Sequence, residues 1–256
     1  MNDLFSGKSK EEIAIERIKA FCPPDGYYLA FSGGKDSIVI LDLVKRSGVP
    51  FDAHYNVTGI DPPELVRFIR TFPEVKRHRP ENTMWQLIEK NGLPTRWARF
   101  CCRYLKEGGG VGRNILTGVR WEESVKRSKR RMTEACMKDE TKMYIHPIID
   151  WSSRDVWGYI REKKLPYCSL YDEGWKRIGC IMCPNSDMKS HSLRWPRYAE
   201  LYKKALNKFW QLRTPEQKEK YALELNWNNP NDYYQWWICG KSGKNTTNPD
   251  QSVVFE

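Results

Sequence analysis

The sequence predicts an α/β fold with a doubly wound, mainly parallel sheet and a helical extension at its C-terminal end. Two observations predict the sheet. Short apolar runs of strand character alternate with segments of helical spacing, and a glycine turn joins the first of these runs to a helix. A chain of 256 residues is long enough for one such core with a small helical appendage. Sheets of this kind bind ligands at the carboxyl ends of their strands.

The elements of the core follow in chain order. Apolar residues at helical spacing predict a first helix over 10–21, which Pro23 and Pro24 end. The other elements expected are a strand at 27–31, a helix at 37–47, a strand at 51–57, helices at 64–71 and 83–91, and strands at 115–119 and 144–148. Gly48 and Gly92 stand where glycines commonly end helices.

The composition changes after Pro184, which suggests a domain over 1–185 and an extension over 186–256. In the extension an aromatic and apolar stripe predicts a helical cap over 190–225 and is typical of core packing. The stripe consists of Trp195, Tyr198, Leu201, Tyr202, Leu206, Phe209 and Trp210. After Asn226 we expect irregular structure, in which Trp236 and Trp237 fit either base stacking or, more commonly, burial as anchors.

The turn after the first strand carries anion-binding chemistry. It reads Ser32, Gly33, Gly34, Lys35, Asp36 and Ser37. Two glycines let successive amide N–H groups face a phosphate, and the following helix adds its positive end. Lys35 supplies a mobile cation, the serines donate hydroxyl hydrogen bonds, and Asp36 can cap the helix or hold Mg²⁺. The spacing differs from that of the Walker P-loop, which places four residues between its first glycine and its Gly-Lys pair.

Four of the eight cysteines form two pairs, Cys101 with Cys102 and Cys180 with Cys183. Four thiolates suit either zinc or an iron–sulfur cluster, while buried reduced thiols are the plain alternative. Neighbouring side chains on a helix point about 100° apart, so a vicinal pair fits a cluster with several iron corners better than one zinc ion. The remaining cysteines, Cys22, Cys136, Cys168 and Cys239, read as packed or free thiols.

The formal net charge of +11 favours polyanionic or nucleotide partners without identifying one. The densest basic run, 126–131, fits a solvated helix face, a phosphate or sulfate clamp, or part of a nucleic-acid footprint. We see no long uncharged apolar run and no charged-then-apolar leader, so we expect neither a membrane span nor a signal peptide. We therefore expect a cytoplasmic protein, where clustered thiols favour metal binding over disulfides.

Several segments of the sequence resemble the motifs of one known family, and they occur in the same order along the chain. The glycine turn resembles the pyrophosphate-binding PP-loop of the ATP pyrophosphatase and adenosine-nucleotide α-hydrolase superfamily. The segment from Thr117 to Arg127, with Gly118, Arg120, Glu122, Glu123 and Ser124, is similar to the TGxRxxES segment of the phosphoadenylyl-sulfate (PAPS) reductase family. The stretches His146 to Trp151, Asp155 to Trp157, Leu165 to Tyr167, Leu170 to Gly174 and Ile178 to Cys180 continue the likeness.

The resemblance implies a fold of the PP-loop, adenosine-nucleotide α-hydrolase type and an enzyme. It implies catalytic roles for Lys35 and Asp36, with ATP or another adenosine nucleotide and Mg²⁺ bound. The nucleotide-binding residues it implies are Ser32, Gly33, Gly34, Lys35, Asp36, Ser37, Gly118, Arg120 and Arg127. The tandem cysteines followed by Cys-x-x-Cys resemble the [4Fe-4S] ligands of adenylyl-sulfate reductases, which implies a cluster on Cys101, Cys102, Cys180 and Cys183.

The family's reductases attack the sulfate sulfur with a cysteine in a C-terminal Glu-Cys-Gly-Leu-His-like motif, which this chain lacks. Its one late cysteine is Cys239, with neither the acidic neighbour nor the histidine. We therefore expect ATP-dependent sulfur transfer, to tRNA or DNA and with a cysteine desulfurase as partner. PAPS or adenylyl-sulfate reduction to sulfite with thioredoxin is the alternative, and a non-enzymatic nucleotide or nucleic-acid binding module is a third reading.

Overall fold

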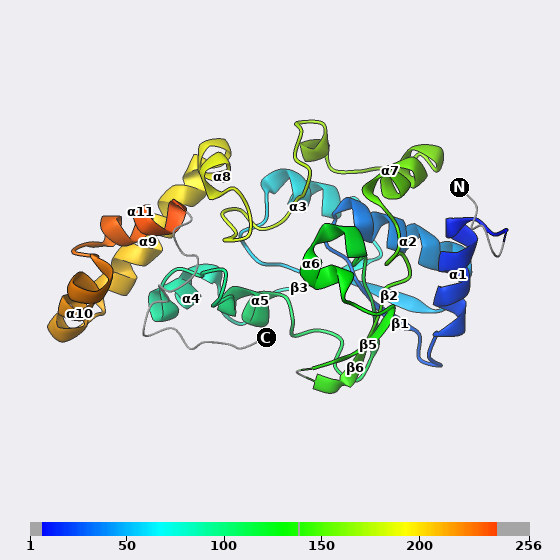
Figure 1. Cartoon of the computed structure of the whole chain (residues 1–256), viewed down its shortest axis with the longest axis horizontal. Coiled ribbons are helices and arrows are strands. Elements are labelled where there is room, and N and C mark those ends of the chain that lie inside the picture. Colours follow the sequence, from blue (N-terminus) through cyan, green and yellow to red (C-terminus); the bar gives the residue numbers. More distant parts are fainter. Residues whose placement is uncertain (1–6, 138, 240–256) are drawn as a thin grey trace. The chain divides into compact units, whose positions relative to one another are not determined.

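A computed structural model of the chain describes residues 7–137 and 139–239 (Figure 1). In its first half the elements are α1 (Lys10–Ala20), β1 (Tyr27–Ala30), α2 (Lys35–Ser47), β2 (Phe51–Asn56), α3 (Pro63–Ile69), β3 (Val75–His78), α4 (Met84–Asn91), α5 (Phe100–Leu105) and β4 (Asn114–Leu116). They continue with η1 (Trp121–Glu123), α6 (Val125–Ser128), β5 (Thr133–Cys136), β6 (Asp139–Ile145), α7 (Ser153–Glu162), η2 (Ser169–Tyr171), α8 (Met188–Arg194), α9 (Pro196–Gln211), α10 (Pro215–Leu225) and α11 (Pro230–Ile238).

The six strands form one sheet in the order β3-β2-β1-β4-β6-β5. All neighbouring strands are parallel except β5 and β6, which are antiparallel. β2 and β3 lie on one side of β1, and β4, β6 and β5 lie on the other. The strand order therefore reverses between the parallel neighbours β1 and β4, where Leu29 pairs with Leu116. The predicted doubly wound, mainly parallel α/β fold is confirmed. The point of reversal is where such sheets open a ligand crevice.

The structure forms two compact units, each made of several segments. The first draws on Met1–Asn56, Pro63–His78 and Gly109–Ile178, and it contains the sheet. The second draws on Val57–Pro62, Arg79–Gly108 and Gly179–Glu256. The loop at Ser32–Ser37 therefore belongs to the first unit and the four paired cysteines to the second. The predicted domain boundary after residue 185 remains a prediction.

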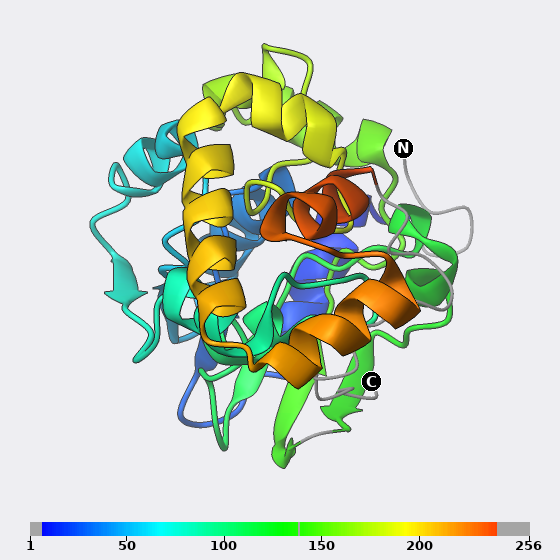
Figure 2. The same cartoon turned by 90° about the vertical axis from the view of Figure 1, so that its left-hand side faces the viewer.

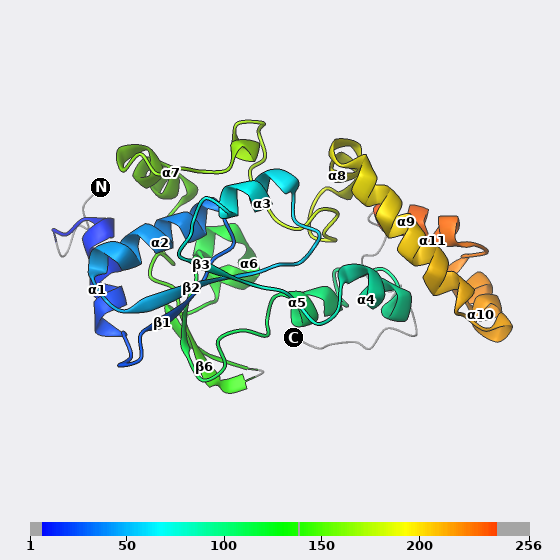
Figure 3. The same ribbon diagram turned by 180° about the vertical axis from the view of Figure 1, so that it is seen from behind.

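The core of the first unit holds the two elements that flank the loop. Apolar side chains bury both sides of β1, and α2 buries an almost continuous apolar run from Ile38 to Val44. Helix α2 packs between α1 and α7, on the side of the sheet drawn above it in Figure 1 and seen from behind in Figure 3. Gly48, at φ +74°, ends α2 as predicted. The loop thus lies between a buried strand and a buried helix.

The second unit has an aromatic core. Helix α9 packs against α4, α8 and α11, and Figure 2 shows α10 (orange) and α11 (red) folding back beside it. Tyr202 and Phe209 are buried on α9, as the stripe predicts. Trp227 stacks on Tyr233 with ring centroids 3.9 Å apart. This helical extension confirms the prediction for 190–225.

The irregular structure expected after Asn226 is wrong for Pro230–Ile238, which is the helix α11. Asn229 caps this helix, since its side chain accepts hydrogen bonds from the N–H groups of Asn231 and Asp232. Trp237 is fully buried and its indole N–H donates to the carbonyl of Pro94, at 2.6 Å. Trp237 is thus an anchor of the core and not a surface for stacking bases.

Other elements were not expected from the sequence. The edge strand β3 exposes three of its four residues and β5 buries none fully, so neither shows the apolar alternation of a half-buried strand. Helix α7 begins with a capping box in which Ser152 and Asp155 satisfy each other's backbone N–H groups. The strand expected over 115–119 ends at Leu116, which leaves Thr117 to Arg120 as a loop. No helix in the described ranges is long and apolar enough to cross a membrane.

Candidate nucleotide and cysteine sites

Gly33 and Gly118 make the close packing of the loop possible. Gly33 has φ +71°, and a Cβ there would lie 2.6 Å from Cγ1 of Ile69. The hydroxyl of Ser37 donates to the carbonyl of Gly34 at 2.8 Å and accepts from the N–H of Ser32 at 3.3 Å, which fixes the turn. A Cβ on Gly118 would lie 2.8 Å from Cβ of Asp36. The loop after β4 therefore packs directly on the start of α2.

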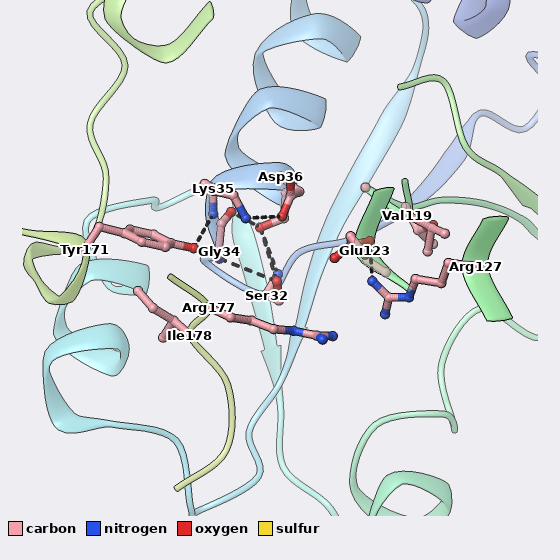
Figure 4. Close-up of a pocket in the computed structure, with 14 residues that line it drawn as sticks. Ser32, Gly34, Lys35, Asp36, Val119, Glu123, Arg127, Tyr171, Arg177 and Ile178 are labelled. Carbon is pink, nitrogen blue, oxygen red and sulfur yellow. Dashed lines mark hydrogen bonds and ion pairs between the residues drawn. The ribbon is translucent and has the colours of Figure 1, made fainter. Parts of the chain in front are cut away.

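A cavity of about 210 Å³ lies where these two loops meet, at the carboxyl ends of β1 and β4 (Figure 4). It is lined by Ala30, Ser32, Gly34, Lys35, Asp36, Ser37, Thr117, Gly118, Val119, Glu123, Arg127, Tyr171, Arg177 and Ile178. The structure thus brings most of the predicted nucleotide-binding residues to one cavity of the first unit. Gly33 and Arg120 are not among the lining residues.

Lys35, Asp36 and Arg120 form a chain of charges beside the cavity. The Lys35 ammonium lies 3.1 Å from Oδ2 of Asp36, and Nε of Arg120 donates to Oδ1 of the same carboxylate at 2.8 Å. Asp36 therefore has a cation on each oxygen. A magnesium ion on Asp36 would share the carboxylate with these two cations, so that role stays a prediction.

Arg120 is only 2 % exposed, and most of its N–H groups already have protein acceptors. Nη1 donates to Glu122 and to the carbonyl of Trp151, and Nη2 donates to Ser153. The Arg120 side chain holds Asp36 in place. Its contact with a nucleotide remains a prediction. Arg127 lines the cavity and pairs with Glu123.

Tyr171 and Arg177 line the cavity, although the sequence assigned neither of them a role. The Tyr171 hydroxyl accepts from the backbone N–H of Lys35 at 2.9 Å, and burial raises the pKa of this phenol. Figure 4 shows the side chain of Arg177 extending past Ser32 into the space between the loops. Tyr171 lies in one segment that resembles the PAPS reductase family, and Arg177 directly precedes another. The resemblance of a whole segment does not tell which of its side chains lines a cavity.

His146 contacts Thr117, which lines the same cavity. Its Nδ1 lies 2.6 Å from the Thr117 hydroxyl, and its fully buried Nε2 has no hydrogen-bond partner among the described residues. Burial, with the positive charges of Arg130 and Arg127, lowers the pKa of His146 to about 4. The imidazole is therefore neutral at pH 7.

The second unit brings the four paired cysteines near one another, and their role as cluster ligands stays a prediction. Cys101 and Cys102 lie in the first turn of α5. Cys180 and Cys183 flank a tight turn in which the N–H of Cys183 donates to the carbonyl of Cys180 at 3.3 Å. Met182, inside this turn, has φ +56°, and its N–H donates to Nδ1 of the buried His191 at 2.9 Å.

The four thiols affect one another electrostatically. A hydrogen bond that the Cys101 thiol donates to Cys102, followed by burial and the negative charges of Cys102, Cys180 and Cys183, raises the pKa of Cys101. The same bond lowers the pKa of Cys102, which is therefore the thiolate of the vicinal pair. Burial raises the pKa of Cys180 to about 12, and Lys106 hydrogen-bonds to it.

All eight cysteines are free thiols, so the four are available as ligands. In the described part of the chain, no group of three His, Cys, Asp or Glu side chains closes around a single metal ion. Four thiols in one unit are a donor set that either an iron–sulfur cluster or a zinc ion uses. The donor set is thus compatible with the predicted cluster.

Comparison with known proteins identifies relatives of the chain. Residues 26–186 match the phosphoadenosine phosphosulfate reductase domain. The chain is 30% identical to uncharacterized protein MJ0066 of Methanocaldococcus jannaschii over 217 residues, 78% of this chain and 43% of that protein. It is 26% identical to the adenosine 5'-phosphosulfate reductase of Allochromatium vinosum over 230 residues, 82% of this chain and 84% of that enzyme.

Among solved structures, the fold is similar to that of phosphoadenylyl-sulfate (PAPS) reductase from Candida auris in a phosphate complex. The TM-score is 0.53 at 21% sequence identity, covering 70% of this chain and 92% of that one. The chain spans half or less of the length of its two M. jannaschii relatives, MJ0066 and MJ0973.

Proposed function

Since this chain belongs to the phosphoadenosine phosphosulfate reductase domain family, we propose that it is an enzyme that binds an adenosine nucleotide at Ser32–Ser37 and uses ATP for sulfur transfer. The observation that carries the proposal is the cavity where the loops after β1 and β4 meet, with Lys35 and the start of α2 on its wall. Helix N-termini and loop amides bind phosphates in this arrangement.

In the proposed reaction an oxygen of the acceptor attacks the α-phosphorus of ATP. A bond forms between this oxygen and the phosphorus, the bond from the α-phosphorus to the bridging oxygen breaks, and pyrophosphate leaves with the electron pair. Sulfur at the sulfide level then attacks the activated acceptor atom and displaces AMP. Lys35 and the loop amides stabilise the charge that develops on the phosphates, and Asp36 holds Lys35 in position.

Cys101, Cys102, Cys180 and Cys183 are the residues that would hold a [4Fe-4S] cluster. Such a cluster would supply a site for binding or relaying sulfur, or would brace the second unit. Lys106, which hydrogen-bonds Cys180, offers a positive charge to the anionic ligand set. Reduced thiols at all four positions suit a reducing compartment, so the proposal places the enzyme in the cytoplasm.

The proposed acceptor is a nucleic acid, either tRNA or DNA, and the proposed sulfur source is a cysteine desulfurase. A thiol reductant converts the outer sulfur of its persulfide to sulfide, and two thiols are oxidised to a disulfide in that step. The formal charge of +11 and the basic run at 126–131 support a polyanionic partner. Within this run Arg127 and Arg130 pair with Glu123 and Glu134, while Lys129 is exposed. Part of the run thus stabilises the local fold, and the rest can contact a backbone phosphate.

Sulfonucleotide reduction is the second candidate, and the similarity to the A. vinosum adenosine 5'-phosphosulfate reductase favours it. A cysteine thiolate would attack the sulfate sulfur, the nucleotide would leave, and a thioredoxin-type dithiol would then release sulfite. Cys239, exposed at the end of α11, is the candidate nucleophile. The sequence around it lacks the acid and the histidine that would favour its thiolate.

One experiment separates the two candidates. Anaerobically purified protein is incubated with ATP, adenylyl sulfate or PAPS, with and without nucleic acid and thioredoxin, and both pyrophosphate and sulfite are measured. The proposal expects pyrophosphate and AMP from ATP and no sulfite. Sulfite release that disappears in Cys239→Ser would replace the proposal with the second candidate, and neither product from any nucleotide would refute both.

A further inference from the structure

A second cavity of about 190 Å³ adjoins the nucleotide cavity in the first unit. Its walls are formed by Lys35, Arg120, Glu122, Glu123, Ser153, Lys176 and Arg177. Lys35, Glu123 and Arg177 also line the first cavity, so the two share a wall. Neither the predicted chemistry nor the proposed reaction uses Lys176 or Arg177.

The carboxylates of the second cavity already have cationic or backbone partners. Glu122 accepts from Nη1 of Arg120 at 3.1 Å and from the N–H of Ser153. Glu123 accepts from the backbone N–H of Arg120 at 3.0 Å and pairs with Arg127. These acids therefore serve to fix the loop after β4.

The positive charges of Lys176 and Arg177 are not neutralised by neighbouring acids in this way. Both are exposed, and neither makes an ion pair or a hydrogen bond with any residue that the structure describes. Counting both cavities, five cationic side chains face three carboxylates, and these two are the cations in excess. Two uncompensated cations beside a phosphate-binding loop create a local positive potential that attracts anionic groups.

We infer that the two cavities form one site for a polyphosphate chain, in which Arg177 and Lys176 bind the phosphates beyond the one held by the loop. The inference rests on the proposed function, in which the ligand is a nucleoside triphosphate, and it assigns two further residues to that ligand's phosphates. The flat guanidinium of Arg177 can donate two parallel hydrogen bonds to phosphate oxygens, and Figure 4 shows it extending past Ser32 into the space between the loops. A phosphosulfate is shorter by one anionic group and leaves the second cavity empty.

Titration calorimetry on the full chain tests this with ATP, inorganic pyrophosphate, AMP, adenylyl sulfate and PAPS as separate probes. Arg177→Ala is expected to weaken ATP and pyrophosphate binding by about 10- to 100-fold, as expected for a lost charged hydrogen bond. Lys176→Ala, at a residue that lines only the second cavity, should weaken the same two ligands less and change the binding of AMP and adenylyl sulfate by less than about twofold. Arg177→Lys should restore part of the affinity, since lysine keeps the positive charge but cannot donate two parallel hydrogen bonds to a phosphate.

Arg161→Ala is the matched control, because Arg161 is exposed on α7 of the same unit and lines neither cavity. Equal weakening of AMP and ATP in Arg177→Ala, or unchanged ATP affinity, would overturn the inference. Selective loss of PAPS binding would also overturn it, by assigning the second cavity to a 3'-phosphate. If ATP binds through Arg177 but releases no pyrophosphate, the proposed function fails and the subsite stands. If the wild type binds neither ATP nor pyrophosphate, both fail.

Discussion

Gly118→Ala should separate the loop after β4 from the start of α2. The added Cβ would lie 2.8 Å from Cβ of Asp36, 3.0 Å from its carbonyl carbon and 3.1 Å from its carbonyl oxygen. Two of these atoms belong to the backbone of a buried helix, so no flexible side chain can move aside. Overpacking of this kind costs about 1–3 kcal/mol. Part of that strain should displace Asp36, and with it the Lys35 ammonium that it holds.

Thermal unfolding and nucleotide binding by calorimetry measure the two effects. For a chain of this size, the destabilisation corresponds to a Tm lowered by about 2–10 °C, and nucleotide affinity should fall with it. Gly158→Ala is the control, since nothing lies within 4 Å of a Cβ built at Gly158 in α7. In a helix that change should be neutral or stabilising by up to about 1 kcal/mol. Indistinguishable Tm values and affinities for the two variants would refute the reasoning.

Three further predictions follow from the same sites. Anaerobically purified protein should be brown with about four irons per chain, lost when the Cys-x-x-Cys cysteines are replaced by serine; stoichiometric zinc without iron would contradict this. Cys239→Ser should keep most of the pyrophosphate release, because Cys239 is exposed at a helix end; loss of activity with an unchanged Tm would contradict it. His146 has a depressed pKa of about 4, so it contributes stability that is present above about pH 6.5 and lost as the pH falls towards 4. The difference in unfolding free energy between wild type and His146→Asn should therefore narrow over that range, and parallel pH curves would argue against it.

The anion-binding loop and the strand and helix on either side of it could be predicted because the residues that specify them are consecutive in the sequence. An apolar strand, two glycines and an apolar helix specify the anion-binding turn without reference to the rest of the chain. The prediction that the two cysteine pairs bind one metal cluster came from residue type, spacing and the family resemblance. Gly118 was expected in the site, and it lines the cavity because its missing Cβ lets the loop after β4 approach the start of α2.

Other features depend on the tertiary structure and leave no local pattern. The ion pair of Arg120 with Asp36 and its hydrogen bond to Ser153 join residues that lie far apart in the sequence, while its predicted contact with the nucleotide stays a prediction. Tyr171 reaches the N–H of Lys35 across 136 positions. The helix α11 was missed because its aromatic residues carry no clear helical stripe until the core of the second unit defines which side is buried.

The central claim is that Ser32–Ser37 binds the phosphates of an adenosine nucleotide, and calorimetry of ATP binding to Lys35→Ala tests it most directly. Lys35 is almost buried, with 7 % of its side chain exposed, and lines both cavities. Its loss should cost about 1.5–3 kcal/mol of charged hydrogen bonding, which is roughly a 10- to 150-fold weaker affinity, with the protein still folded. Lys45→Ala, at the far end of the same helix, should bind ATP as the wild type does. Unchanged ATP affinity in a folded Lys35→Ala protein would contradict the claim.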